Sequence, residues 1–137
     1  MTHFDFSPQA VAVLAHADVA RALAEDVGSG DLTAGLIDPK RRARARIVVR
    51  EAAVLCGSAW VTAAVSALDP SAVLRWHVQE GERTEAGQVV LDIEGQAQAL
   101  LTAERTALNF LQLLSAVSTQ THAFVQAVAS NIVILFF

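Results

Sequence analysis

The sequence of 137 residues contains one cysteine, one lysine, three prolines and no tyrosine. The single cysteine, Cys56, excludes an internal disulfide framework and a cysteine-rich zinc site, and it fits a reducing compartment. No apolar run approaches the roughly 18 residues of a membrane-spanning helix, and no basic stretch precedes an apolar one near Met1. We therefore expect a cytoplasmic protein with no membrane span and no signal peptide.

Positive charge is also scarce, because ten lysines and arginines oppose 14 acidic residues and leave a net charge of −4. A general nucleic-acid-binding protein needs a basic surface, so we expect no nucleic-acid partner. Apolar residues, in contrast, make up 53% of the chain, and charged residues only 18%. Such a chain can bury a core, and its length suits one compact domain, or one domain and a fragment of another.

Two periodicities predict the secondary structure. Alternating residues indicate strands, most clearly over residues 42–50, where alanine or aliphatic side chains alternate mostly with arginine. Apolar residues at helical spacing indicate helices, with Ser7 and Pro8 as a start signal and Gly28 as a stop signal. The predicted strands cover residues 42–50, 52–56, 73–78, 88–93 and 131–137. The predicted helices cover residues 8–25, 57–68, 98–115 and 119–129.

The predicted helix over residues 98–115 carries the most informative polar side chains. Arg105 and Asn109 lie one turn apart on its polar side, where a guanidinium group and an amide can face one ligand or one partner surface. Glu104 falls inside the apolar arc, so its carboxylate should be paired or hydrogen-bonded. On spacing alone, Arg105 is more simply a solvated arginine, and Glu104 a structural tether.

Other polar groups give weaker signals. The acidic glycine turn at residues 26–31 lacks the spacing of a phosphate-binding loop, so a helix-ending turn is the simpler interpretation. The arginines of strand 42–50 could bind an anion, although a solvated strand surface is more common. The hairpin at residues 80–95 is similar to those of biotinyl and lipoyl carrier domains, yet Lys40, the only lysine, lies outside it. The four histidines show no metal-ligand spacing.

Three further segments are distinctive when they are taken in order along the chain. They are EDVGSGDLT at residues 25–33, REAAVLCG at 50–57 and ERTALNFLQ at 104–112. In this order, with a hairpin between the second and the third, they resemble the N-terminal domain of quinolinate phosphoribosyltransferase, also called carboxylating nicotinate-nucleotide pyrophosphorylase. The resemblance extends from residue 20 to about residue 125, and its third segment is the most specific.

The resemblance implies an α+β fold, in which an antiparallel sheet and helices form an open, hammerhead-like α/β sandwich. In the family, this N-terminal domain precedes a C-terminal α/β barrel. We expect residues 1–115 to form the domain, and residues 116–137 to contain an entry helix and the start of the barrel, which is otherwise absent. A chain truncated in this way should be inactive alone.

The family converts quinolinate and phosphoribosyl pyrophosphate into nicotinate mononucleotide, pyrophosphate and carbon dioxide in de novo NAD biosynthesis. The resemblance implies a homodimer that uses Mg²⁺ with phosphoribosyl pyrophosphate, both held by the barrel. No catalytic residue and no metal ligand are therefore expected within this chain. Two alternatives stay open: a non-catalytic dimerising or binding module, and the N-terminal domain of a related phosphoribosyltransferase.

The resemblance also implies one substrate contact within this chain. Arg105 matches the family arginine that reaches into the active site of the neighbouring subunit and contacts quinolinate, a dianion whose carboxylates suit a planar guanidinium group. Glu104 is then a buried anchor for the helix, and Asn109 a weaker supporting contact.

Overall fold

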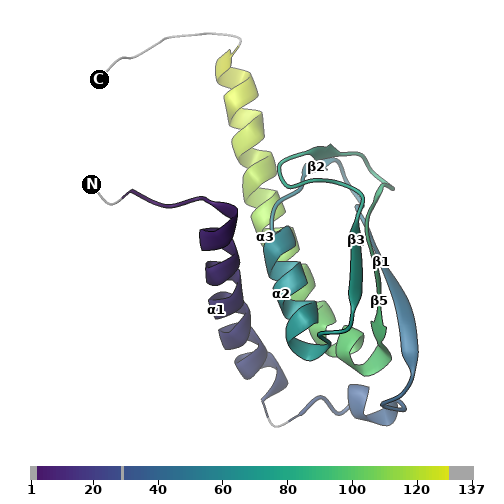
Figure 1. Ribbon diagram of the computed structural model, residues 1–137. Helices are drawn as coiled ribbons and strands as arrows, with labels where there is room; N and C mark the ends of the chain where they lie inside the picture. Colours follow the sequence, from purple (N-terminus) through teal and green to yellow (C-terminus); the bar gives the residue numbers. More distant parts are fainter. Residues whose placement is uncertain (1–2, 29, 130–137) are drawn as a thin grey trace.

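The computed structural model describes residues 3–28 and 30–129 (Figure 1). The helices in these residues are α1 (Pro8–Val27), the 3₁₀ helix η1 (Ala34–Leu36), α2 (Ser58–Leu68) and α3 (Ala97–Ala129). The strands are β1 (Arg42–Val48), β2 (Ala53–Val54), β3 (Val73–Trp76), β4 (Arg83–Thr84) and β5 (Val89–Gln96). None of the described helices is both long enough and apolar enough to cross a membrane.

The strands are paired in an antiparallel manner, as the sequence predicted. β5 lies between β1 and β3, and β2 pairs with β4 in a second, two-stranded sheet. Figure 1 shows the three α-helices side by side next to the larger sheet, with α1 farthest from it. The other face of that sheet exposes its β1 arginines to solvent. This arrangement is the open α/β sandwich of the predicted α+β fold.

β1 owes its orientation to the alternation of its residues. Its arginines are exposed, whereas Ala45 and Ile47 are half-buried and pair in register with Ile93 and Leu91 of β5. Leu91 is completely buried. Because successive side chains of a strand point to opposite faces, the aliphatic residues turn toward the helices and the arginines turn toward water.

Small residues let the helices approach one another closely. Ala63 of α2 and Ala103 and Ala107 of α3 are buried in the core. Gly57 precedes α2 with a φ of +110°, and a Cβ atom at this position would lie 3.2 Å from Leu114 Cδ1 of α3. The alanine-rich composition thus gives a core that depends on close backbone packing as well as on large side chains.

α3 is a single helix of 33 residues, which corrects the expectation of two helices with a break at residues 116–118. Serine and threonine hydroxyl groups near this position are able to compete with helical hydrogen bonds. In the structure these hydroxyls bind the backbone at residues 54–56, and Thr119 Oγ1 also donates to Ser115 O of the same helix. Ser115 Oγ accepts from Cys56 N and donates to Cys56 O, and Thr119 Oγ1 accepts from Val54 N at 2.9 Å. The helix therefore continues without interruption.

Some predicted strands differ in extent from the observed ones. The strand expected over residues 52–56 is reduced to the two residues of β2, and its partner β4 was not predicted. Both are too short to show an alternating pattern. The strand expected over residues 131–137 lies outside the described residues. The domain boundary between residues 115 and 116 stays a prediction, and α3 runs through it.

Candidate functional site

Arg105 and Asn109 are exposed on α3, one turn apart. The buried residues Ala103 and Ala107 lie on the opposite side of the helix, toward the core. Within the described part of the chain, no carboxylate lies within ion-pair distance of Arg105. The structure therefore places both residues on the polar side of the helix, as the spacing predicted, and it leaves the guanidinium group free to meet an anion from outside the domain.

A row of donors on α3 holds the end of α1 and the loop at residues 30–37. Thr102 Oγ1 donates to Asp31 Oδ2 at 3.1 Å, and Thr106 Oγ1 donates to Asp26 Oδ2 at 2.9 Å. One turn earlier, Gln98 Nε2 donates to the backbone oxygen of Ile37. We call Gln98, Thr102 and Thr106 the donor row. Their spacing of four residues places them on one side of the helix, and this spacing is the signal from which they could have been found in the sequence.

Asp31 organises the loop that the donor row holds. Its Oδ1 atom accepts from the backbone N–H groups of Thr33 and Ala34 at 3.0 and 3.1 Å. The pKa of Asp31 is lowered by the Ala34 N–H group and the Thr102 hydroxyl, and to a smaller extent by the charge of Arg105. The acidic glycine turn follows the end of α1, as the simpler interpretation held, and its Asp31 carboxylate is near enough to Arg105 for that charge to lower the Asp31 pKa.

A groove of about 1250 Å³ lies between α3 and β1. Its lining is mostly apolar and includes Ala45 and Ile47 from β1 and Leu100 and Leu111 from α3. Arg105 is not part of this lining. The candidate substrate contact and the groove are therefore separate features of α3.

Glu104 is exposed at the groove, which corrects the expectation that it is a buried anchor. The helical pattern placed Glu104 in the apolar arc of α3, and that arc does extend to this residue. However, the arc is wider than the packed core and continues along the groove, where water reaches the carboxylate. Glu104 therefore needs no buried partner.

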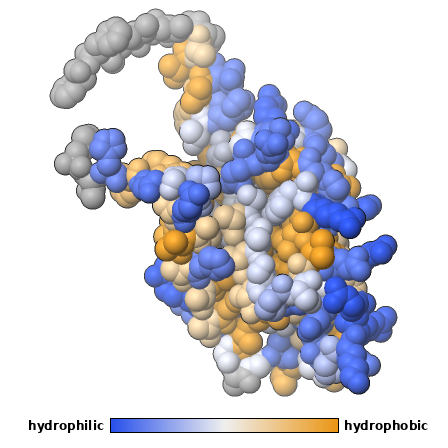
Figure 2. Space-filling model, in the orientation of Figure 1, coloured by the Kyte–Doolittle hydropathy of each residue, from blue (hydrophilic) through white to orange (hydrophobic). Residues whose placement is uncertain are grey.

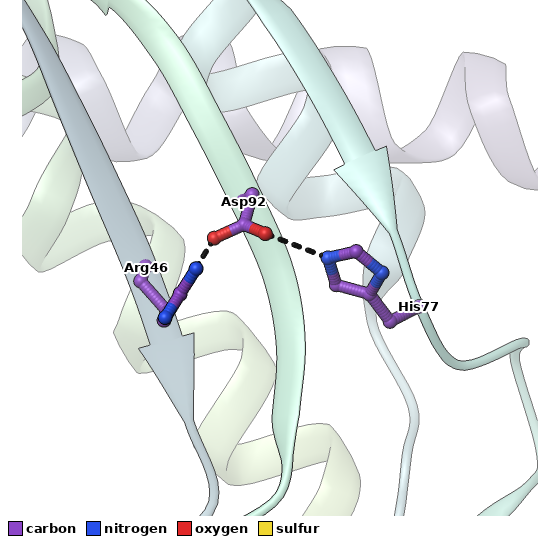
Figure 3. A network of polar contacts seen from close by, with 3 residues as sticks. All are labelled: Arg46, His77 and Asp92. Atoms are coloured by element: carbon purple, nitrogen blue, oxygen red, sulfur yellow. Dashed lines mark hydrogen bonds and ion pairs between the residues drawn. The ribbon is translucent and has the colours of Figure 1, made fainter.

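The arginine-rich face of the larger sheet carries a network of ion pairs (Figure 3). Asp92 Oδ1 accepts from Arg46 Nε at 2.7 Å, and Asp92 Oδ2 lies 2.8 Å from His77 Nε2. The Arg46 hydrogen bond is the main cause, and the His77 contact the second, of a lowered pKa for Asp92. Arg44 also lies 3.4 Å from Glu94. Since acids of β5 offset arginines of β1, this face is best explained as a solvated surface with weak ion pairs.

Cys56 is not an activated nucleophile. Burial, together with the nearby Glu80 carboxylate, raises the pKa of the Cys56 thiol to about 11. Glu80 itself accepts from Gly57 N at 2.7 Å and from Ser58 N at 3.0 Å, and so caps α2. A thiol with this pKa stays protonated at neutral pH, so it lacks the thiolate form that attacks or binds metal.

Metal-binding side chains are not clustered in the described part of the chain. Within residues 3–28 and 30–129, no three histidine, cysteine, aspartate or glutamate side chains come together in a group that could hold a metal ion. The lowered-pKa carboxylates Asp31, Asp69 and Asp92 are each engaged by protein donors.

Comparisons with known proteins agree on one family. The family model described as "Quinolinate phosphoribosyl transferase, N-terminal domain" matches residues 31–115. A probable nicotinate-nucleotide pyrophosphorylase (carboxylating) of Bacillus subtilis is 34% identical over 102 residues, which are 74% of this chain and 35% of that protein. A protein of the same name from Synechocystis is 37% identical over 107 residues, with 78% and 36% covered.

Solved structures give the same result. The nicotinate-nucleotide pyrophosphorylase of Francisella tularensis superposes with a TM-score of 0.83 at 30% identity, over 87% of this chain and 42% of that chain. NadC from Streptococcus pyogenes superposes with the same score at 31% identity, over 94% and 45%. The chain spans about a third of the length of the curated relatives it matches. Sequence and fold together show that the chain belongs to the quinolinate phosphoribosyltransferase family, whose N-terminal domain it contains.

Proposed function

We propose that this chain is the N-terminal domain with which a cytoplasmic, homodimeric quinolinate phosphoribosyltransferase completes the active site of its second subunit. The proposed reaction joins quinolinate and phosphoribosyl pyrophosphate into nicotinate mononucleotide and releases pyrophosphate and carbon dioxide. The observation that carries the proposal is Arg105, a side chain held outward on α3 with no carboxylate of the described residues within ion-pair distance.

The chemistry of Arg105 suits a dicarboxylate substrate. A guanidinium group stays charged at physiological pH and presents two parallel N–H donors to one carboxylate. Asn109 is exposed one turn further along α3, so its amide can donate to the same ligand. Fixed positive charge and hydrogen-bond donors at a substrate anion are a main source of electrostatic stabilisation in group-transfer reactions.

The remaining parts of the reaction are proposed for the second domain that the relatives possess. Among the described residues, no group of carboxylate or imidazole ligands forms a metal site, so Mg²⁺ and phosphoribosyl pyrophosphate are assigned to that domain. The role of this chain is to bind and orient quinolinate at the entrance of a neighbouring site. Orientation alone lowers the activation barrier substantially in such reactions, because the reacting groups are already held in the right geometry.

The proposal is tested in a chimera that joins residues 1–129 of this chain to the C-terminal portion of the Bacillus subtilis relative. We expect this chimera to form nicotinate mononucleotide, and Arg105→Ala to lower kcat/KM for quinolinate about 100-fold. Arg75→Ala is the matched control, because Arg75 is also exposed but lies on the outer face of β3. It should leave kcat/KM within about twofold of the unmodified chimera.

Two results would argue against the proposal. Unchanged kcat/KM in the Arg105→Ala chimera would remove Arg105 from the substrate site. A folded, dimeric chimera with no activity would instead favour the alternative that this domain is a non-catalytic dimerising or binding module.

A further inference from the structure

The Asp31 carboxylate is fixed from two sides. Its Oδ1 atom accepts from the N–H groups of Thr33 and Ala34 in the loop, and its Oδ2 atom accepts from the Thr102 hydroxyl of α3 at 3.1 Å. The two N–H groups alone would satisfy a turn that begins with an aspartate. The third donor comes from a different element, and it fixes the negative charge of Asp31 against the surface of α3.

Arg105 lies on the part of α3 that Asp31 contacts. It follows Thr102 by three positions, so the two residues are about 60° apart around the helix axis. A long side chain on a helix leans toward the preceding turn, which carries Arg105 over Thr102 and toward the Asp31 carboxylate. After the Ala34 N–H group and the Thr102 hydroxyl, the charge of Arg105 is a smaller cause of the lowered pKa of that carboxyl.

The two charges are close to one another without forming an ion pair. Among the ion pairs of the described residues, none includes Arg105. A guanidinium group has five N–H donors, and a ligand carboxylate bound by two parallel hydrogen bonds uses two of them. Asp31 can therefore attract the guanidinium group to one region of the surface and still leave enough donors for an anion from outside the domain.

We propose that Asp31 is a positioning residue for Arg105: its fixed carboxylate draws the guanidinium group to the side of α3 beside Thr102, before quinolinate binds. The inference rests on the proposed function, in which Arg105 contacts quinolinate. Asp31 itself does not contact the substrate. It acts through Arg105, because a long side chain that is already oriented loses less conformational freedom when the ligand binds.

The test removes the charge of Asp31 in two versions of the chimera. Asp31→Asn keeps a side-chain oxygen that can accept from the N–H groups of the turn. It should lower kcat/KM for quinolinate about tenfold when Arg105 is present. In a chimera that already carries Arg105→Ala, the same substitution should change kcat/KM by less than about twofold, because no guanidinium group is left to orient.

Glu94→Gln is the matched control. It also removes one negative charge, but Glu94 lies on the outer face of β5, 3.4 Å from Arg44. This substitution should leave kcat/KM within about twofold of the unmodified chimera. A tenfold loss in Glu94→Gln as well would overturn the inference, since a change in total charge would then explain the effect of Asp31→Asn.

The two backgrounds separate this inference from the proposed function. If Asp31→Asn lowers kcat/KM equally with and without Arg105, the loop acts on the fold, and the positioning role is overturned. If Asp31→Asn leaves kcat/KM unchanged or raises it while Arg105→Ala lowers it, the positioning role fails and the proposed function stands. If Arg105→Ala alone has no effect, both fail.

A second measurement needs no activity. An NMR titration of the full chain of 137 residues gives the pKa of the Asp31 carboxyl group directly. We expect this pKa to be higher in Arg105→Ala than in the unmodified chain, because the charge of Arg105 lowers it. Glu94→Gln should leave it unchanged. An Asp31 pKa that does not respond to Arg105→Ala overturns the inference, whether or not the chimera is active.

Discussion

Asp69 is a buried carboxylate whose two oxygens both receive hydrogen bonds. Asp69 Oδ1 accepts from Ser71 N at 3.0 Å and from Ser71 Oγ at 2.6 Å, and Asp69 Oδ2 accepts from Gln96 N at 2.8 Å. The side chain thereby connects the end of α2 to the end of β5. Gly95 leaves room for this contact, because a Cβ atom there would lie only 2.9 Å from Asp69 Oδ2 and 3.1 Å from Ala72 Cβ.

We expect Gly95→Ala to lower the free energy of unfolding by about 2 kcal/mol, because the added methyl group displaces the Asp69 carboxylate or the Ala72 backbone. Gly35→Ala is the control, since a Cβ at Gly35 meets no atom within 4 Å. It should change the same quantity by no more than about 0.5 kcal/mol. Urea denaturation followed by circular dichroism measures both. Equal stabilities for the two variants would show that the Gly95 site can adjust.

Asp69 should also make stability depend on pH. The Ser71 hydroxyl, followed by the Gln96 N–H group, lowers the pKa of Asp69 in the folded protein. The ionised carboxylate therefore stabilises the fold above its unfolded pKa of about 3.9, and this contribution is lost as the pH falls through the lower, folded pKa.

The measurement compares urea midpoints of the unmodified protein and Asp69→Asn at several pH values. The difference between them should be largest near neutral pH and should shrink as the pH falls below about 3.9 and through the lower pKa of Asp69 in the folded protein. Asp31, Asp92 and Glu80, which also have lowered pKa values, are unchanged in both proteins. A difference that does not vary with pH would mean that the charge of Asp69 contributes nothing.

At the residue scale, helical spacing predicted that Arg105 and Asn109 lie on the polar side of α3. It could not predict the environment of Glu104, because a helical pattern does not show whether an apolar arc meets a packed core or an open groove. The contact between Asp69 and Gly95 was also beyond prediction. Its partners lie 26 residues apart, and no local pattern marks either of them.

At the scale of elements, the donor row attaches the end of α1 and the loop at residues 30–37 to α3. We expect Thr106→Val to lower the free energy of unfolding by about 1 kcal/mol, because Asp26 loses the hydroxyl of a fully buried residue. Amide exchange at the C-terminal end of α1, around Asp26, should also accelerate. Thr121→Val is the control: its exposed hydroxyl donates only to Val117 O of the same helix. Equal stability and exchange in the two variants would contradict this role.

The helices and strands were predictable to different degrees. α1 and α2 agree with their sequence signals, because Ser7 accepts from Ala10 N at the start of α1 and because Gly57 adopts the positive φ that precedes α2. The length of α3 was not predictable. Its serine and threonine residues stabilise contacts with β2, a tertiary role that overrides their local preference.

At the scale of the whole molecule, apolar and hydrophilic surfaces lie over different elements of the fold. Figure 2 shows apolar surface over α1 and the upper part of α3, and hydrophilic surface along the edge where Figure 1 places β1. Phe124, Val125 and Val128 near the end of α3 are exposed. The fold class and strand pairing could be predicted from alternation in β1 and from the three family motifs, whereas the groove emerges only from the packing of α3.

Mixing two inactive chimeras tests directly whether Arg105 completes the site of another subunit. One carries Arg105→Ala, and the other keeps Arg105 but is inactivated in its catalytic half. If Arg105 acts across the dimer, the mixed dimers contain one complete site, and about a quarter of the unmodified activity should return after subunit exchange. If the mixture stays inactive although mixed dimers form, Arg105 does not serve the neighbouring subunit, and the proposed function is wrong.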